Sequence, residues 1–193
     1  SHELTFFLIR NTDIKNINKI FKKVNLHVNK IFIKNYVEGS CLINKHRVET
    51  FFFLKLNKDN IKLIFFDKSS FRYSQKFNFG TDIILKDISK VCSLGEEAVI
   101  KILTDNILQK KIFNEDEVLE EKYFIKDNFR KIRKKLIKEV AIARIEEIVD
   151  LVIKKNLNLK SFKKDNVNNY IFFEDENISN NFFTDIRNYI SLN

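Results

Sequence analysis

Two groups of charged side chains have types and spacing that could support chemistry. Glu174, Asp175 and Glu176 follow a predicted strand and could bind a metal ion or act as an acid, but a solvated acidic loop is the simpler interpretation. Six Lys and Arg side chains lie within residues 130–138 and could contact nucleic acid phosphates. A solvated helix face is favoured over this reading, because the run lacks the interleaved aromatic residues that stack on bases.

Most other catalytic patterns are missing from the sequence. Its three glycines are isolated, which excludes a glycine-rich phosphate loop, and no Gly-x-Ser-x-Gly nucleophile motif occurs. The three histidines are scattered and there is no Cys-x-x-Cys pair, so no metal site with the usual ligand spacing is predicted. Cys41 and Cys92 lie in apolar stretches, and we expect both to be packed thiols and not reactive ones.

The composition indicates a folded chain of one or two domains. Its 193 residues are 44% hydrophobic and 32% charged, enough to bury a core. No apolar run approaches the roughly 20 residues that cross a membrane, no signal peptide is predicted, and two cysteines favour a reducing, cytoplasmic compartment. With no methionine, the chain is expected to begin at a cut or cloned site.

The net charge of +9 does not by itself indicate a polyanionic partner. Phe, Ile, Lys and Asn, all with A/T-rich codons, are abundant, and 28 Lys stand against 7 Arg. Codon bias of an AT-rich genome therefore explains much of the charge.

Hydrophobic periodicity predicts the elements that would position these side chains. Strands are predicted at 4–9, 31–33, 51–56, 61–66, 71–79 and 170–173, and helices at 13–24, 36–43, 83–91, 96–103, 127–155 and 182–190. Residues 51–79 would form a three-stranded meander. Strand–helix units around such a meander indicate a layered α/β fold.

Three segments, taken in order, carry a resemblance to a known family. They are GTDIILKDIS at 80–89, EEAVIK at 96–101 and VAIARIEEI at 140–148. Together they resemble the second half of FtsA, an actin-like bacterial cell-division protein. The resemblance implies half of an actin-like (ribonuclease H-like) ATPase fold with a small α+β subdomain. The domains would be 1–103 as core, 104–155 as an inserted small subdomain with the long helix, and 156–193 as the rest of the core.

The chain departs from this family where the family binds ATP and Mg²⁺. The glycines of the phosphate loop are replaced within residues 55–60, and the acid that would organise Mg²⁺ is a lysine. A second glycine pair is replaced by two acids, and the glutamate that contacts the ribose corresponds to Val99. The degraded nucleotide-loop positions are Lys55, Asn57, Lys58, Asp59, Glu174 and Asp175. The resemblance thus implies a pseudo-ATPase for which no cofactor is expected.

The resemblance also implies a partner, the C-terminal tail of the tubulin-like division protein FtsZ. The matching tail-binding positions are Arg130, Arg144 and Glu147. Fourteen residues separate the two arginines, close to four helical turns, so a continuous helix would place all three on one face. Arg144 interrupts an apolar stripe, where an arginine usually has a partner. The alternative to tail binding is that Arg144 pairs within the chain, with Asp150 or a neighbouring glutamate.

The leading hypothesis is therefore an FtsA-like division scaffold that holds FtsZ at the inner face of the membrane at the division site. It would self-associate, and it would attach to the membrane only through a segment that this chain lacks. An actin-like ATPase with an unconventional ATP site is one alternative. A basic nucleic-acid-binding module is the other, and the less favoured.

Overall fold

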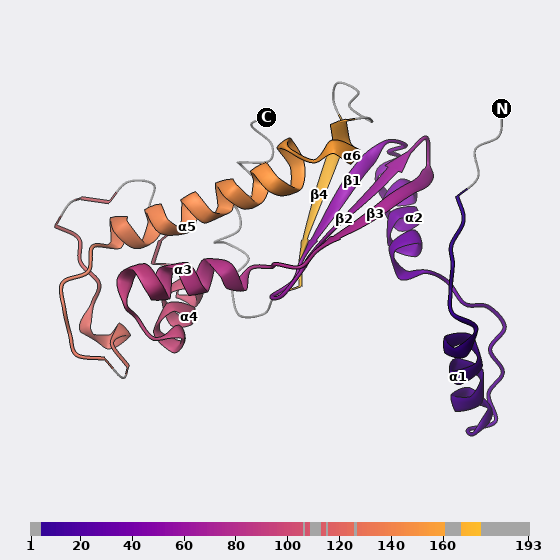
Figure 1. Cartoon of the computed structure of the whole chain (residues 1–193), viewed down its shortest axis with the longest axis horizontal. Coiled ribbons are helices and arrows are strands. Elements are labelled where there is room, and N and C mark those ends of the chain that lie inside the picture. Colours follow the sequence, from indigo (N-terminus) through magenta and orange to yellow (C-terminus); the bar gives the residue numbers. More distant parts are fainter. Residues whose placement is uncertain are drawn as a thin grey trace. The chain divides into compact units, whose positions relative to one another are not determined.

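The structure is a computed structural model that describes residues 5–105, 107–108, 113–114, 116–125, 127–160 and 167–174 (Figure 1). The chain folds as two compact units. Unit 1 combines Ser1–Phe51 with Ile64–Tyr73, and unit 2 combines Phe52–Leu63 with Ser74–Asn193, as far as the described ranges reach. No described helix is both long enough and apolar enough to cross a bilayer.

The described elements follow the predicted order in most places. They are α1 (Asn11–Lys22), α2 (Lys34–His46), β1 (Phe51–Leu56), β2 (Ile61–Asp67), β3 (Ser70–Phe77), α3 (Asp82–Cys92), α4 (Glu96–Thr104), a 3-10 turn (Glu121–Tyr123), α5 (Lys134–Val149), a π-helical turn (Asp150–Lys154), α6 (Leu157–Lys160) and β4 (Asn168–Phe173). The strands form one sheet in the order β3-β2-β1-β4. The predicted meander is confirmed. The predicted domain boundaries stay a prediction, and the predicted helix 182–190 lies outside the described residues.

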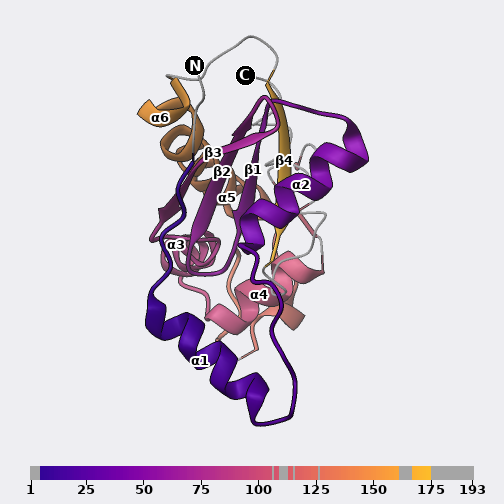
Figure 2. The same cartoon turned by 90° about the vertical axis from the view of Figure 1, so that its right-hand side faces the viewer.

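In unit 1, α2 packs closely on β2. A Cβ built on Gly39 of α2 would lie closer than 3.0 Å to the ring of Phe66, so a larger residue there would displace the ring. The rings of Phe51 and Phe66 stack with their centroids 5.1 Å apart. Figure 2 shows α2 from a second direction.

The first two predicted strands are wrong. In the structure, residues 5–9 and 31–33 lie outside any strand, and Leu4 is outside the described residues. Leu8 is 99% exposed and Phe32 is 66% exposed. Apolar runs of this kind predict strands because strands usually bury them, whereas here most of these side chains stay exposed and Phe7 is only partly covered, by the rings of Phe71 and Tyr36.

In unit 2, α3 and α5 lie side by side and share much of the core (Figure 1). Ile137, Ala141 and Ile148 of α5 are buried, whereas Leu151 in the π-helical turn that follows is 43% exposed. The predicted helix 127–155 starts too early. Arg133, directly before α5, instead forms an isolated antiparallel bridge with Val118, next to which the amide of Leu119 donates to the carbonyl oxygen of Ile132 at 2.7 Å.

Candidate functional site

The carboxyl ends of β1 and β4 meet at one edge of the sheet. The amide of Glu174, directly after β4, donates to the carbonyl oxygen of Leu56, the last residue of β1, at 3.0 Å. Ligands of open α/β sheets bind outside this edge. Most of the positions that the resemblance assigns to the nucleotide loops therefore lie at the edge where a nucleotide would be expected.

The β1–β2 turn, residues 57–60, is hydrogen-bonded to the start of α3. The amides of Thr81 and Asp82 donate to the carbonyl oxygens of Asn57 and Lys58, both at 3.0 Å. A Cβ on Gly80 would lie closer than 3.0 Å to both carbonyl oxygens. Amides at a helix start can bind an anion, but these two are already bonded to the protein's own backbone.

Lys55 and Glu174 form an ion pair at the same edge. The Lys55 side chain is 4% exposed, and its Nζ lies 3.7 Å from Oε1 of Glu174, whose side chain is 36% exposed. A lysine this deeply buried is almost always paired, because an isolated ammonium group loses its hydration. The sequence identifies both positions as departures from the family, but spacing does not reveal that they meet.

The remaining positions that the resemblance assigns to nucleotide binding lie in different environments. The carboxylate of Asp59 accepts a hydrogen bond from Nδ2 of Asn60 at 2.6 Å in the exposed turn. Val99 is fully buried in α4, so its side chain faces the core and not a ligand. Asp175 and Glu176 lie outside the described residues. Among the described residues, no cluster of His, Cys, Asp or Glu side chains could hold a metal ion.

Arg144 joins α5 to α3. Its Nε donates to Oδ2 of Asp87, and its Nη1 donates to Oε2 of Glu147. The Arg144 and Asp87 side chains are each 29% exposed. The intramolecular alternative is therefore what the structure contains, with a neighbouring glutamate as one partner. Asp87 is missing from the sequence-based prediction, because no spacing rule connects residue 87 with residue 144.

Asp150, the other partner expected for Arg144, pairs elsewhere. Its carboxylate lies 3.4 Å from Nζ of both Lys154 and Lys155. A shallow pocket of about 430 Å³ adjoins this group and Glu147. It is lined by Ala143, Glu146, Glu147, Val149, Asp150, Leu151, Lys154 and Lys155.

Arg130 does not share a helix face with Arg144, because it precedes α5. Its guanidinium donates to the carbonyl oxygens of Cys92 and Ser93 and so caps the carboxyl end of α3. Burial raises the pKa of the Cys92 thiol, and the charge of Arg130 opposes that shift. The packed thiol predicted for Cys92 is confirmed, whereas Cys41 is exposed and that prediction is wrong.

Several side chains of the basic run at 130–138 contact other residues of unit 2. Besides Arg130, Lys134 lies 3.5 Å from Oε1 of Glu120, and Nζ of Lys138 lies 5.8 Å from the ring centroid of Phe113. These contacts favour a structural role for the run over phosphate binding.

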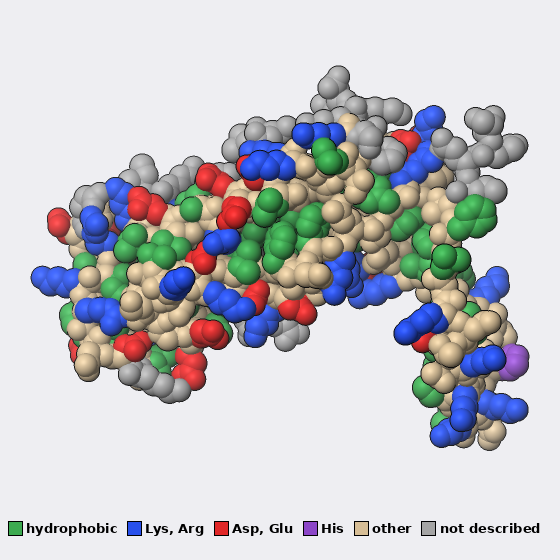
Figure 3. Space-filling view, viewed as in Figure 1, with side chains coloured by type: hydrophobic (Ala, Val, Ile, Leu, Met, Phe, Trp, Pro, Cys, Tyr) green, Lys and Arg blue, Asp and Glu red, His purple; other side chains and the backbone are tan. Residues whose placement is uncertain are grey.

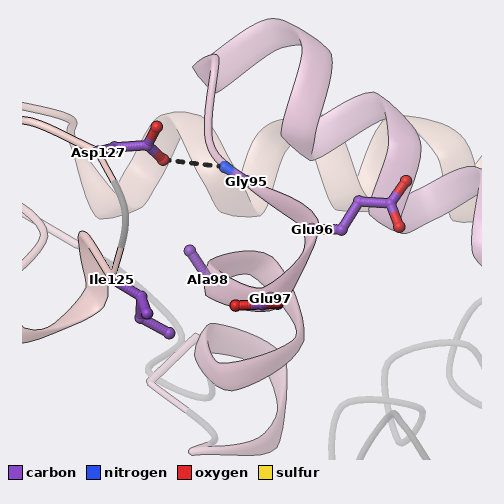
Figure 4. Close-up of a pocket in the computed structure, with 6 residues that line it drawn as sticks. All are labelled: Gly95, Glu96, Glu97, Ala98, Ile125 and Asp127. Carbon is purple, nitrogen blue, oxygen red and sulfur yellow. Dashed lines mark hydrogen bonds between the residues drawn. The ribbon is translucent and has the colours of Figure 1, made fainter.

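A second pocket, of about 340 Å³, lies at the start of α4 (Figure 4). Asp127, predicted to begin the long helix, instead accepts a hydrogen bond from the amide of Gly95 at 3.1 Å and caps α4. Glu96 and Glu97 also line this pocket, so its charge does not suit a phosphate group.

Comparisons with known proteins give the fold. No protein-family model matches the sequence, and no curated protein matches it either. MreB5 of Spiroplasma citri bound to ADP matches with a TM-score of 0.53 and 10% identity, over 95% of this chain and 65% of that chain. The AMPPNP-bound form matches with a TM-score of 0.52 and 12% identity, over 95% and 63%. The ethanolamine utilization protein EutJ of Carboxydothermus hydrogenoformans matches with a TM-score of 0.51 and 9% identity, over 79% and 46%.

The chain has an actin-like fold. This confirms the predicted fold class, an α/β fold of the actin-like kind. The match extends over less than two thirds of the length of these structures. At 9–12% identity the likeness establishes the fold alone, and the similarity to the MreB5 structures does not transfer their nucleotides to this chain.

Proposed function

We propose that the chain is the scaffolding part of an actin-like protein resembling FtsA, and that it binds a partner's tail without using ATP. The observation that carries this proposal is the sheet edge, where the Lys55–Glu174 ion pair and the turn bonded to α3 lie at the positions that the resemblance assigns to the nucleotide loops. The protein would act in the cytoplasm at the division site, bind the FtsZ C-terminal tail and self-associate.

The groups at this edge do not fit a magnesium nucleotide. The ammonium of Lys55 would repel Mg²⁺ where the family has an acid, and the carboxylate of Glu174 would repel phosphate oxygens. The amides of Thr81 and Asp82 already donate to carbonyl oxygens. Binding a phosphate there would first break two backbone hydrogen bonds.

We therefore expect no binding of ATP to the purified protein at millimolar concentration, with or without Mg²⁺, by isothermal calorimetry and by thermal shift. The control is Lys55→Asp, which places at this position the acid that the FtsA family has there. We expect this variant to bind no ATP either, because the two amides remain bonded to the turn. Magnesium-dependent ATP binding to the native protein with micromolar affinity would instead support the ATPase alternative.

The partner site that we propose lies on α5, around Arg144 and the adjoining pocket. Arg144 keeps 29% of its side chain exposed, and Leu151 in the pocket is 43% exposed. An acidic tail could compete with Asp87 for the guanidinium, since a carboxylate binds Arg in the same geometry. Glu147 lines the pocket, and Arg130 would support the site from the far end of α3.

For a synthetic FtsZ tail peptide, we expect Arg144→Glu to reduce binding at least about tenfold, a loss of about 1.4 kcal/mol. We expect Asp87→Asn to strengthen binding, because it removes an internal competitor for the guanidinium. Fluorescence anisotropy with labelled peptide measures both. Lys90→Glu makes the same change of charge at an exposed position of α3 and should leave binding unchanged. Failure of the native protein to bind, or equal losses in Arg144→Glu and Lys90→Glu, would contradict this site.

A further inference from the structure

Helix α1 presents an apolar face that nothing in the described part of unit 1 buries. Ile17, Ile20 and Phe21 are spaced three and four apart, which places them on one side of α1, and Val24 lies in the turn directly after the helix ends at Lys22. Ile20 and Val24 are each 64% exposed and Phe21 is 43% exposed, and α1 has no buried residue. Scattered exposed apolar residues are common, whereas a continuous apolar helix face indicates a contact surface.

The segment that contains α1, residues 10–34, holds much of the positive charge of the chain. Residues 10–34 carry seven Lys and Arg against one acid, Asp13, so their net charge is +6 of the total of +9. The one carboxylate is paired with Arg10 at 3.0 Å. Figure 3 shows Lys and Arg side chains gathered over α1, with hydrophobic side chains along its edge. At 3.6 residues per turn, Lys15, Lys19 and Lys22 fall on the side away from the apolar face.

An open groove of about 480 Å³ continues the apolar face beyond the end of α1. Its lining is mainly apolar, with one histidine, one asparagine and one lysine among the lining residues. The lining residues are Ile17, Phe21, Leu26, His27, Val28, Asn29, Lys30 and Ile31. Leu26 and Ile31 are 57% and 42% exposed, so the groove adds hydrocarbon surface that a neighbouring apolar layer could cover.

The charge distinguishes between the occupants that could cover this surface. A second copy would bring another segment of charge +6 against the first, and the two would repel each other. A nucleic acid would satisfy the cations but leave the apolar face in water. An anionic lipid surface satisfies both, because acyl chains cover the apolar face while lipid phosphates attract the lysines, whose long side chains reach the headgroups.

We propose that α1, together with the groove that follows it, binds to the surface of an anionic lipid bilayer. The helix lies in the plane of the interface with Ile17, Ile20 and Phe21 toward the acyl chains, and Val24 in the turn after the helix adds to this apolar surface. At 1.5 Å per residue its twelve residues extend about 18 Å, which suits an interfacial helix. This site is independent of the tail-binding site proposed on α5, and it replaces the sequence-based expectation that membrane attachment needs a segment absent from this chain.

A single introduced tryptophan tests this contact, because the chain contains no Trp. We expect the emission of Phe21→Trp to shift to shorter wavelength when vesicles of phosphatidylglycerol and phosphatidylcholine are added. Pure phosphatidylcholine vesicles should give no shift, and high salt should weaken the effect because the attraction is screened. The control is Leu157→Trp in α6, a position in unit 2 that is 76% exposed. Its emission should not change.

Vesicle co-sedimentation of variants then separates the contribution of the apolar face from that of the lysine charges. We expect Ile20→Glu and the double change Lys19→Glu with Lys22→Glu each to lower the partition coefficient at least about tenfold. Leu157→Glu should leave it unchanged. The substituted side chains are exposed, so circular dichroism should show unaltered folding. Equal binding to neutral vesicles, no shift for Phe21→Trp, or dimerisation through α1 in light scattering without lipid would each overturn the proposal.

Discussion

We expect Gly80→Ala to lower the free energy of unfolding by about 1–3 kcal/mol, the usual range for overpacking. The new Cβ would lie closer than 3.0 Å to the backbone carbonyl oxygens of Asn57 and Lys58. Backbone atoms cannot rotate away as the end of a side chain can. Moving the turn would also stretch the hydrogen bonds that Thr81 and Asp82 donate to it. Urea denaturation followed by circular dichroism measures the change.

The matched control for this prediction is Gly95→Ser at the start of α4. A Cβ on Gly95 would meet nothing closer than Oδ2 of Asp127, at 3.7 Å, and serine is a favourable residue at a helix N-cap. We expect this variant to unfold within about 0.5 kcal/mol of the native protein. If the two glycine variants lost equal stability, the close approach of the turn to α3 would not be the cause.

The part of the fold that the sequence predicts best is the part with the strongest local pattern. The runs at 51–56 and 61–66 are almost wholly buried, so continuous hydrophobicity identifies β1 and β2 correctly. The predicted start of α5 is wrong because Lys and Arg favour helix, whereas the carbonyl oxygen of Ile132 accepts a hydrogen bond from the amide of Leu119, thirteen residues earlier. Local propensity cannot anticipate that tertiary contact.

The site is harder to predict because its contacts join distant segments. Lys55 and Glu174 are 119 residues apart, and Asp87 and Arg144 are 57 apart. The family resemblance singles out three of these four residues one by one, but it does not pair them. The role of Gly80 is likewise invisible in sequence, because it depends on how closely the β1–β2 turn approaches the start of α3.

The largest effect that we expect comes from reversing the charge of Lys55. In Lys55→Glu, two carboxylates would face each other at a position where the native side chain is 4% exposed. Breaking a buried ion pair by changing one partner typically costs about 3–5 kcal/mol. Because Glu174 is 36% exposed and can turn toward water, we expect a value near the lower end, about 3 kcal/mol. Chemical denaturation of the single variant provides the measurement.

The charge swap Lys55→Glu with Glu174→Lys separates the ion pair from the packing of the lysine side chain. If attraction between the two charges holds the ends of β1 and β4 together, the double variant should recover a substantial part of the loss, as a positive coupling in a double-mutant cycle. Lys58→Glu makes the same change of charge in the exposed turn and should alter stability by no more than about 0.5 kcal/mol. A double variant no more stable than Lys55→Glu alone would contradict the pair. Recovery in the swap, without any gain of ATP binding, would mean that this edge of an actin-like sheet is stabilised by its own charges in place of a nucleotide.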